Sequence, residues 1–158
     1  VKLGNLVSNK TKTDKNSISK IDPTFNEEEF LKGAQNFFQM VINSFVKGNL
    51  KDIVNYIDDK LIKNFKSVID ERIEEGESLK IEIVKMKSIK IKDVQELKNF
   101  LRLSVLFETR QIKVLKDKNG KVIDGDPEKS ILVKDLWTFE KEIKSKDINW
   151  KLVETSDA

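Results

Sequence analysis

The longest amphipathic pattern in the chain runs from Phe25 to Gly48 and predicts a single helix. Asn26 is a suitable N-cap, with Glu29 at the capping-box position three residues later. Phe25 and Phe30 occupy the two positions of a hydrophobic staple, and Gly48 suits a left-handed C-terminal cap. At about 1.5 Å per residue this helix is roughly 31 Å long, which is enough to cross a small domain.

The apolar face of this helix is wide, because a second apolar stripe continues beside the first and Met40 extends it on the other flank. A helix that lies on one surface needs an apolar arc of little more than about 100°. We therefore expect both stripes to be buried, each against a different neighbour. The first stripe is Phe30, Ala34, Phe37, Val41 and Phe45, the second is Leu31, Phe38, Ile42 and Val46, and the polar strip is Lys32, Asn36, Gln39, Asn43 and Lys47.

The polar strip also bears on a lipid-contacting role for this helix. Helices that lie on a membrane surface usually carry Lys and Arg on the polar face. Here that face is mostly Asn and Gln, so the pattern favours a core helix over a membrane-surface helix.

Two shorter helical segments follow. The first spans 50–57, and the second spans 60–75, which Asp58 or Asp59 can cap and Gly76 closes. The second segment has one predicted apolar face, made of Leu61, Ile62, Phe65, Val68, Ile69 and Ile73.

After Gly76 the hydrophobic pattern changes to an alternating period, which predicts β-strands. Leu101 to Phe107 alternates most cleanly, whereas residues 81–91 shift phase in a way that predicts bulges. Asp117 to Gly120 predicts a hairpin turn, and residues 125–127 mark a second connection. Helices followed by hairpin-linked strands indicate an α+β fold, with N-terminal helices packed on a strongly curved antiparallel sheet.

The composition limits the classes of function. A chain of 158 residues is one domain with room for a core. It has no His and no Cys, which excludes His-dependent catalysis, His- or Cys-ligated metals and disulfides. The net charge of +3 is too small to name a nucleic acid or a membrane as the partner. No run approaches the roughly 18 apolar residues of a membrane span, and an anchor upstream of Val1 would lie outside this sequence.

Residues 1–21 are predicted to form a basic, flexible tail or linker, and 22–158 a single folded domain. Five lysines in the tail oppose only Asp14, and its apolar residues have no period. Pro23 marks the boundary, because the residue before a proline avoids the helical conformation. A lipid- or partner-binding arm is the alternative interpretation of this tail.

Asp135 is the candidate catalytic carboxylate. It shares a strand face with Trp137 that is expected to point inward, where burial raises the pKa of a carboxyl group. The distinctive candidate partners are Tyr56, Arg102 and Arg110. Because nothing else completes an acid–base set, we favour an ion pair at a sheet edge and predict no catalytic residue and no cofactor.

The acidic run from Glu27 to Glu29 resembles a metal-binding cluster. Carboxylates in the first turn of a helix also oppose the positive end of its dipole, and we favour that explanation. No metal site is predicted.

Lys85, Lys87, Lys90 and Lys92 form a basic strip along one predicted strand. Such a strip can contact RNA or anionic lipid. Lysines also protect an exposed strand edge from pairing with other chains, which is the interpretation we favour.

Four segments of the chain form a recognisable ordered set. They are DPTFNEEEFLKGAQNFFQMVINSFVKGNL (22–50), KDKNGKVIDGDPEK (116–129), DLWTFEKEI (135–143) and INWKLVET (148–155). In this order they resemble the Tim44-like domain family. Lys141 stands where an Arg is commoner in that family, and the basic tail lies outside the match.

The resemblance implies an NTF2-like cone, in which leading helices and a curved antiparallel sheet enclose an apolar pocket. The family's mitochondrial member is a peripheral adaptor on the matrix face of the inner membrane, where it tethers the Hsp70 import motor to the translocation channel and contacts cardiolipin-rich membrane. Its recruitment to the membrane is ascribed to helices at the start of the domain. Bacterial relatives resemble adaptors at the inner membrane, usually with an upstream hydrophobic anchor.

The resemblance therefore implies a non-enzymatic, membrane-associated adaptor domain in protein translocation. It would lie at an inner membrane, on the cytoplasmic side in a bacterium or the matrix side in a mitochondrion. Its expected partners are anionic lipid such as cardiolipin and a membrane or translocation-related protein; nucleic acid is not expected. The expected pocket or lipid-binding residues are Phe37, Val41, Phe45, Phe65, Ile69, Phe107, Trp137 and Phe139, with the basic strip as a second contact surface.

Two alternatives stay open. One is a ribosome- or RNA-facing module, because a mitochondrial large-subunit ribosomal protein shares this domain. The other is a small-molecule-binding or enzymatic cone that uses Asp135, since folds of this kind host both.

Overall fold

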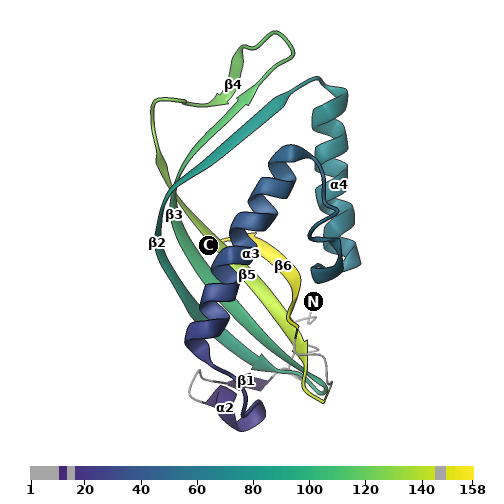
Figure 1. Cartoon of the computed structure of the whole chain (residues 1–158), viewed down its shortest axis with the longest axis vertical. Helices are drawn as coiled ribbons and strands as arrows, with labels where there is room; N and C mark the ends of the chain where they lie inside the picture. The colour runs from purple at the N-terminus through teal and green to yellow at the C-terminus, as the bar shows by residue number, and fades with distance from the viewer. Residues whose placement is uncertain (1–10, 14–16, 145–148) are drawn as a thin grey trace, which may run out of the picture.

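The computed structural model describes residues 11–13, 17–144 and 149–158 and confirms the α+β fold class (Figure 1). Helices come first and an antiparallel sheet follows. The helical elements are α2 (Ile18–Ile21), α3 (Glu27–Lys47), the 3₁₀ turn η3 (Val54–Tyr56) and α4 (Asp59–Glu74). The strands are β1 (Thr11–Thr13), β2 (Ser78–Glu96), β3 (Phe100–Lys116), β4 (Val122–Gly125), β5 (Ile131–Glu142) and β6 (Lys151–Asp157).

The ends of α3 are set by the predicted residues. The Glu29 N–H donates to Asn26 Oδ1 at 2.9 Å, which satisfies one of the free amides of the first turn. The Phe25 and Phe30 rings lie 5.5 Å apart between centroids, as a hydrophobic staple requires. Gly48 ends the helix with φ of 76°, a left-handed conformation that glycine adopts without strain.

The two apolar stripes of α3 are both covered, but to different depths. Phe38 in the second stripe is fully buried, whereas Leu31, Ile42 and Val46 are half-buried. Met40, on the flank of the apolar arc, is exposed. The prediction of burial is thus confirmed for Phe38 and holds in part for the rest of that stripe.

The sheet has the order β1-β2-β3-β5-β6, with β4 paired to the far end of β3, and all neighbouring strands are antiparallel. Figure 1 shows the sheet bending around α3. Register shifts in β2 leave Val84, Lys87 and Lys92 as extra residues, which confirms the predicted bulges. These bulges help a long strand to curve.

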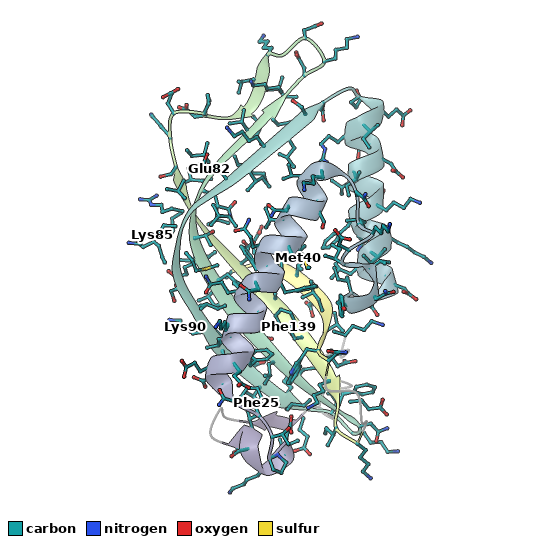
Figure 2. The ribbon with its side chains drawn as sticks, in the orientation of Figure 1. Phe25, Met40, Glu82, Lys85, Lys90 and Phe139 are labelled. Atoms are coloured by element: carbon teal, nitrogen blue, oxygen red, sulfur yellow. The ribbon has the colours of Figure 1, made fainter. Side chains whose placement is uncertain are left out.

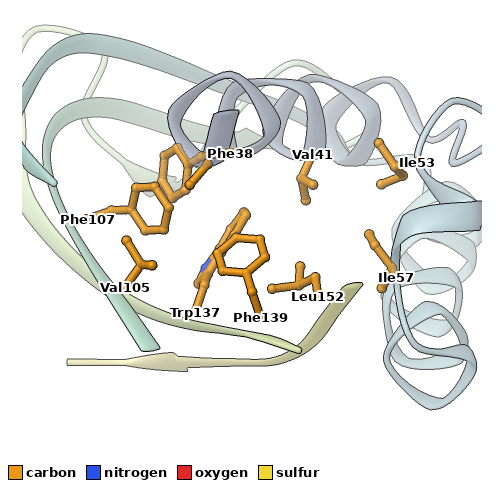
Figure 3. Packing of buried hydrophobic residues seen from close by; sticks show 10 residues of the cluster. Phe38, Val41, Ile53, Ile57, Val105, Phe107, Trp137, Phe139 and Leu152 are labelled. Carbon is orange, nitrogen blue, oxygen red and sulfur yellow. The ribbon is translucent and has the colours of Figure 1, made fainter. Parts of the chain in front are cut away.

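The main core lies between α3 and the concave face of the sheet. Phe38 stacks on Phe107 with 4.4 Å between ring centroids and lies 4.6 Å from Trp137 (Figure 3). Val41 of α3 and Phe139 of β5 complete the buried layer. The predicted alternation from Leu101 to Phe107 supplies the inward side chains of β3.

Part of the predicted tail belongs to the folded unit. β1 pairs with residues 94–96 of β2, and Ile18 is buried in a second core cluster with Val94, Leu101 and Leu103. The folded unit therefore begins before Asp22, because the second cluster uses Ile18 as one of its apolar side chains. Residues 1–10 and 14–16 of the predicted tail lie outside the described residues.

The predicted apolar face of α4 is wrong at two positions. Val68 is 51% exposed and Ile73 is 62% exposed, whereas Ile69 is buried. The buried position that the pattern missed is Arg72, whose Nη2 donates to the carbonyls of Phe45 (2.7 Å) and Val46 (3.2 Å). The carbonyls in the last turn of α3 thus accept hydrogen bonds from Arg72 of α4. A charged side chain therefore lies on the face of α4 that was expected to be wholly apolar.

The predicted hairpin turn is present. The Gly120 N–H donates to the Asp117 carbonyl at 3.0 Å, and Gly120 has φ of 82°. Gly125 also has a positive φ of 83°, and a Cβ there would collide with the carbonyl oxygen of Lys113. Both glycines are needed where they stand.

Candidate functional site

A cavity of about 550 Å³ lies where the N-terminal half of α3 faces β5 and the start of β6. Phe25 and Phe139, labelled in Figure 2, mark this end of the molecule. The cavity walls are mostly aromatic, which suits an apolar guest. The aromatic lining residues are Phe25, Phe30, Phe37, Tyr56, Phe139 and Trp150.

Ring contacts across the chain hold these walls in place. Phe30 of α3 lies 4.9 Å from Trp150 and 5.8 Å from Phe139 between ring centroids, both edge to face. Such contacts each add about 0.5–1.5 kcal/mol beyond area burial. Gly33 of α3 also lines the cavity, and a Cβ built there meets no atom within 4 Å. The cavity is therefore open beside Gly33.

One ion pair lies at the cavity wall. Lys141 Nζ is 2.7 Å from Asp22 Oδ2, and the Thr24 hydroxyl donates to Asp22 Oδ1 at 2.7 Å. Burial raises the pKa of Asp22, but the hydrogen bonds from Lys141 and Thr24 outweigh it, so the pKa is lower than usual. Lys141 Nζ also lies 5.9 Å from the centroid of the Trp150 ring, a cation–π distance.

Of the predicted pocket residues, Phe37 and Phe139 line the cavity. Val41, Phe107 and Trp137 are packed in the main core (Figure 3). Phe45, Phe65 and Ile69 lie where α3 meets α4; the Phe45 and Phe65 rings are 6.0 Å apart, and Ile69 is buried near Gly48. The cavity is thus nearer the N-terminus of α3 than predicted, and a binding role for any of the eight stays a prediction.

Sequence reasoning missed Phe25, Phe30, Trp150 and Lys141 as lining residues. The first two had been noticed only as a staple that starts a helix. Their role as a wall depends on Trp150, some 120 residues later in the chain, so only a contact prediction could have found it.

Asp135 is half-buried on β5. Among the described residues it has no ion pair and no hydrogen bond through its side chain, so the expected ion pair at a sheet edge is not found. Burial raises its pKa, Asp157 across the β5–β6 pairing raises it further, and Lys113 opposes them. Asp135 lies outside the lining of the aromatic cavity.

Among the described residues, none of the three candidate partners forms an ion pair or a hydrogen bond with Asp135. Arg102 Nε donates to Glu140 Oε2 at 2.6 Å, Tyr56 lines the cavity, and Arg110 is exposed. The described residues therefore do not assemble the acid–base set that these side chains might have formed around Asp135.

The acidic run Glu27–Glu29 forms the first turn of α3, where carboxylates oppose the helix dipole. In the parts of the chain that the structure describes, no cluster of carboxylates is arranged to hold a metal ion. The same parts contain no helix with the length and hydropathy of a membrane span.

The basic strip lies on β2, with all four lysines exposed. β1 covers only residues 94–96, so among the described residues β2 is an edge strand along the rest of its length. Lysines and bulges are devices that protect such edges, and the structure thus agrees with the favoured interpretation. Figure 2 shows Lys85 and Lys90 on the side of the sheet away from α3.

The fold and the cavity define a helix-first α+β domain with an open, curved sheet. A model of the Tim44-like domain matches residues 15–157, and the chain belongs to the Tim44-like domain family. The match begins before Asp22, in agreement with the packing of Ile18.

One similar curated protein is the probable mitochondrial import inner membrane translocase subunit tin-44 of Caenorhabditis elegans, which is 21% identical over 159 residues. The alignment covers 97% of this chain but 37% of that protein, so the chain spans little more than a third of the relative's length. Among solved structures, the intermembrane space region of the chloroplast protein ARC6 is similar with a TM-score of 0.50 and 15% identity. That likeness covers 80% of this chain and 95% of the other, and it concerns the fold alone.

Proposed function

We propose that this domain is a non-enzymatic, membrane-associated adaptor in protein translocation. Membership in the Tim44-like family supports the proposal, as does the name of the curated relative, a probable subunit of a mitochondrial import translocase. The observation that carries it is the aromatic cavity, which offers a binding site without an assembled acid–base set among the described residues.

The occupant of the cavity, in this proposal, is an apolar segment of a membrane or translocation-related protein. Its volume of about 550 Å³ lies within the range of well-formed binding pockets and would take a few apolar side chains. The carboxylate of Glu29 at the lining supplies an acceptor for the N–H groups of a peptide backbone. Aromatic walls of this kind are common anchors in protein interfaces.

The second expected partner is anionic lipid such as cardiolipin. The domain would lie at an inner membrane, on the cytoplasmic side in a bacterium or the matrix side in a mitochondrion. Lipid would hold the domain at the bilayer while the cavity holds the protein partner, which is what an adaptor requires.

Photocrosslinking at Gly33 tests the role of the cavity. A photoreactive phenylalanine analogue replaces Gly33, where the cavity has space, in the protein as it is expressed in its own cells. We expect adducts with a membrane or translocation-related protein, identified by mass spectrometry. The matched control places the analogue at Val68, on the exposed side of α4.

Two results would count against the proposal. Identical adducts from Gly33 and Val68 would show that the cavity is not selective. Phospholipid adducts alone at Gly33 would assign the cavity to lipid. As a further check, Gly33→Phe fills the cavity and should abolish capture of the same partner, whereas Gly33→Ala should leave capture within about twofold, because Ala adds little volume and favours the helix.

A further inference from the structure

The charged side chains that line the aromatic cavity give its described walls a net negative charge. Among the described residues these side chains are Asp22, Glu29 and Lys141. Lys141 Nζ is 2.7 Å from Asp22 Oδ2, and both side chains are mostly buried, so these two charges offset each other. Glu29 is exposed and has no ion pair and no side-chain hydrogen bond in the part of the chain that the structure describes. The carboxylate of Glu29 is therefore the charge that a guest meets.

The start of α3 by itself would favour the opposite charge. The N-terminus of a helix carries roughly half a positive charge. Glu28 and Glu29 are both exposed in the first turn of α3, and their two full charges outweigh that partial charge. An anionic guest would thus meet a free carboxylate and a lysine that is already paired, which disfavours its binding.

The aromatic walls suit a cation. The face of an aromatic ring is negative and attracts an ammonium or guanidinium group that lies within about 6 Å of the ring centroid. Six of the described lining residues are aromatic. Tyr56 among them is 44% exposed, so a guest can reach its ring from solvent.

One wall of the cavity already holds a cation of the chain itself. Lys141 Nζ lies 5.9 Å from the centroid of the Trp150 ring, and the Asp22 carboxylate balances its charge. The chain thus combines an ammonium group on an aliphatic stem with an aromatic ring and a carboxylate. A guest cation between the other rings and the carboxylate of Glu29 would repeat this combination.

We propose that the cavity binds an organic cation on an apolar stem, held between the aromatic rings and the carboxylate of Glu29. This inference rests on the proposed function and describes the guest more closely: the apolar segment of the protein partner inserts the side chain of a Lys or an Arg. The stem of that side chain packs on the rings while its charge meets Glu29. Small quaternary ammonium compounds share this chemistry and serve as probes.

Titration of the whole chain with matched probes tests the preference for a cation. Choline and its uncharged carbon isostere dimethylbutanol have the same shape, and the capped peptides Leu-Lys-Leu and Leu-norleucine-Leu form a second such pair. The indole N–H signal of Trp150 in NMR spectra reports binding, and that of Trp137, which is buried in the main core, is the internal reference. In each pair we expect the cationic member to bind at least about fivefold more tightly.

Two pairs of variants locate the cation. Glu29→Gln removes the lining carboxylate, whereas Glu28→Gln makes the same change of charge one residue away, outside the described lining. We expect Glu29→Gln to lower the preference for the cationic probes about threefold and Glu28→Gln to lower it less than about 1.5-fold. Tyr56→Leu removes an accessible ring that Tyr56→Phe keeps, and it should weaken choline binding about threefold relative to Tyr56→Phe. Thermal unfolding checks that all four variants are folded.

Several outcomes would overturn the inference. They are equal affinities within each pair of probes, equal effects of Glu28→Gln and Glu29→Gln, and no shift of the Trp150 signal with any probe. Binding of choline without binding of the lysine peptide would assign the cavity to a small ammonium compound and overturn the assignment to a polypeptide side chain.

The proposed function is decided separately by crosslinking at Gly33. A protein adduct at Gly33 together with no preference for the cationic probes would leave the adaptor function standing and remove the cationic guest. A preference for the cationic probes without any protein adduct at Gly33 would remove the protein partner instead.

Discussion

The two faces of the central sheet use the same strands for opposite purposes. On β3, Phe107 points inward, has no exposed surface and stacks on Phe38 of α3. Its neighbour Glu108 lies on the outer face, between Ser88 of β2 and Lys134 of β5. The concave face is thus specified by apolar packing, whereas the outer face also carries charged side chains, so changes on the first should lower stability more than changes on the second.

Two arginines show the same difference between a residue of the fold and a residue of the outer surface. Arg72 is buried, donates two hydrogen bonds to the end of α3 and lies 5.2 Å from the centroid of the Phe45 ring. Burial lowers its pKa, with Glu77 opposing that effect. Arg110 is exposed and has no partner among the described residues. One cation contributes to the fold, and the other is exposed to solvent.

The largest effect is expected from Phe107→Ala. Removing a fully buried ring that stacks on Phe38 leaves a cavity in the core and should lower the free energy of unfolding by about 3–5 kcal/mol. Glu108→Ala, one residue away on the outer face, should change it by less than about 0.5 kcal/mol. Urea unfolding measures the free energy of unfolding of both variants. Similar losses of stability in the two would contradict the difference between the two faces.

Arg72→Met should have the next largest effect. The variant keeps an apolar stem but loses the donors to Phe45 and Val46, while relief from burying a charge offsets part of the loss. We expect the free energy of unfolding to fall by about 1–2 kcal/mol, against less than about 0.5 kcal/mol for Arg110→Met. If Arg72→Met is as stable as the wild type, the hydrogen bonds from Arg72 to the end of α3 make no net contribution to the free energy of unfolding.

The smallest effects concern two carboxylates with opposite pH dependence. The pKa of Asp22 is lowered in the folded state, so its contribution to stability is present above the unfolded value and is lost as the pH falls through the folded pKa. The pKa of Asp135 is raised, so its contribution is present below the unfolded value and is lost as the pH rises through the folded pKa. The ordinary pKa of both groups is 3.8.

Asp22→Asn and Asp135→Asn should therefore diverge in urea unfolding followed from about pH 2.5 to pH 7. The advantage of the wild type over Asp22→Asn should shrink as the solution becomes acidic. Asp135→Asn should instead gain on the wild type as the pH rises above about 4. Parallel curves for the two variants would contradict the assignment of either environment.

Much of the fold followed from local pattern. The bounds of α3 were readable because Asn26, Phe25 and Gly48 act within one turn of the helix they delimit. The bulges in β2 were readable because each shifts the phase of an otherwise alternating strand. Such features depend on neighbours a few residues away, and so they can be predicted from the sequence alone.

The cavity and the contact between Arg72 of α4 and the end of α3 could not be predicted in the same way. Asp22 meets Lys141 across 119 positions, and Arg72 meets Phe45 across 27. Asp22, Lys141 and Arg72 are charged, and charged residues usually lie on the surface. Contact with a distant partner instead places Asp22 and Lys141 at the cavity wall and Arg72 against the end of α3. Asp135 was predicted to point inward and it lies opposite the buried Phe107, but the expected ion pair is not found among the described residues, because Arg102 and Arg110 lie on the opposite face of the sheet.

The sequence by itself determined the order of helices and strands, the alternation that separates the faces of the sheet, and the absence of His and Cys. Only the tertiary structure decided that Phe25, Phe30 and Trp150 enclose a cavity and that Arg110 and Lys134 join the lysines of β2 on one surface. The physical reason is that period and capping are set by backbone geometry over a few residues, whereas a site is set by which distant side chains the curved sheet brings within reach of one another.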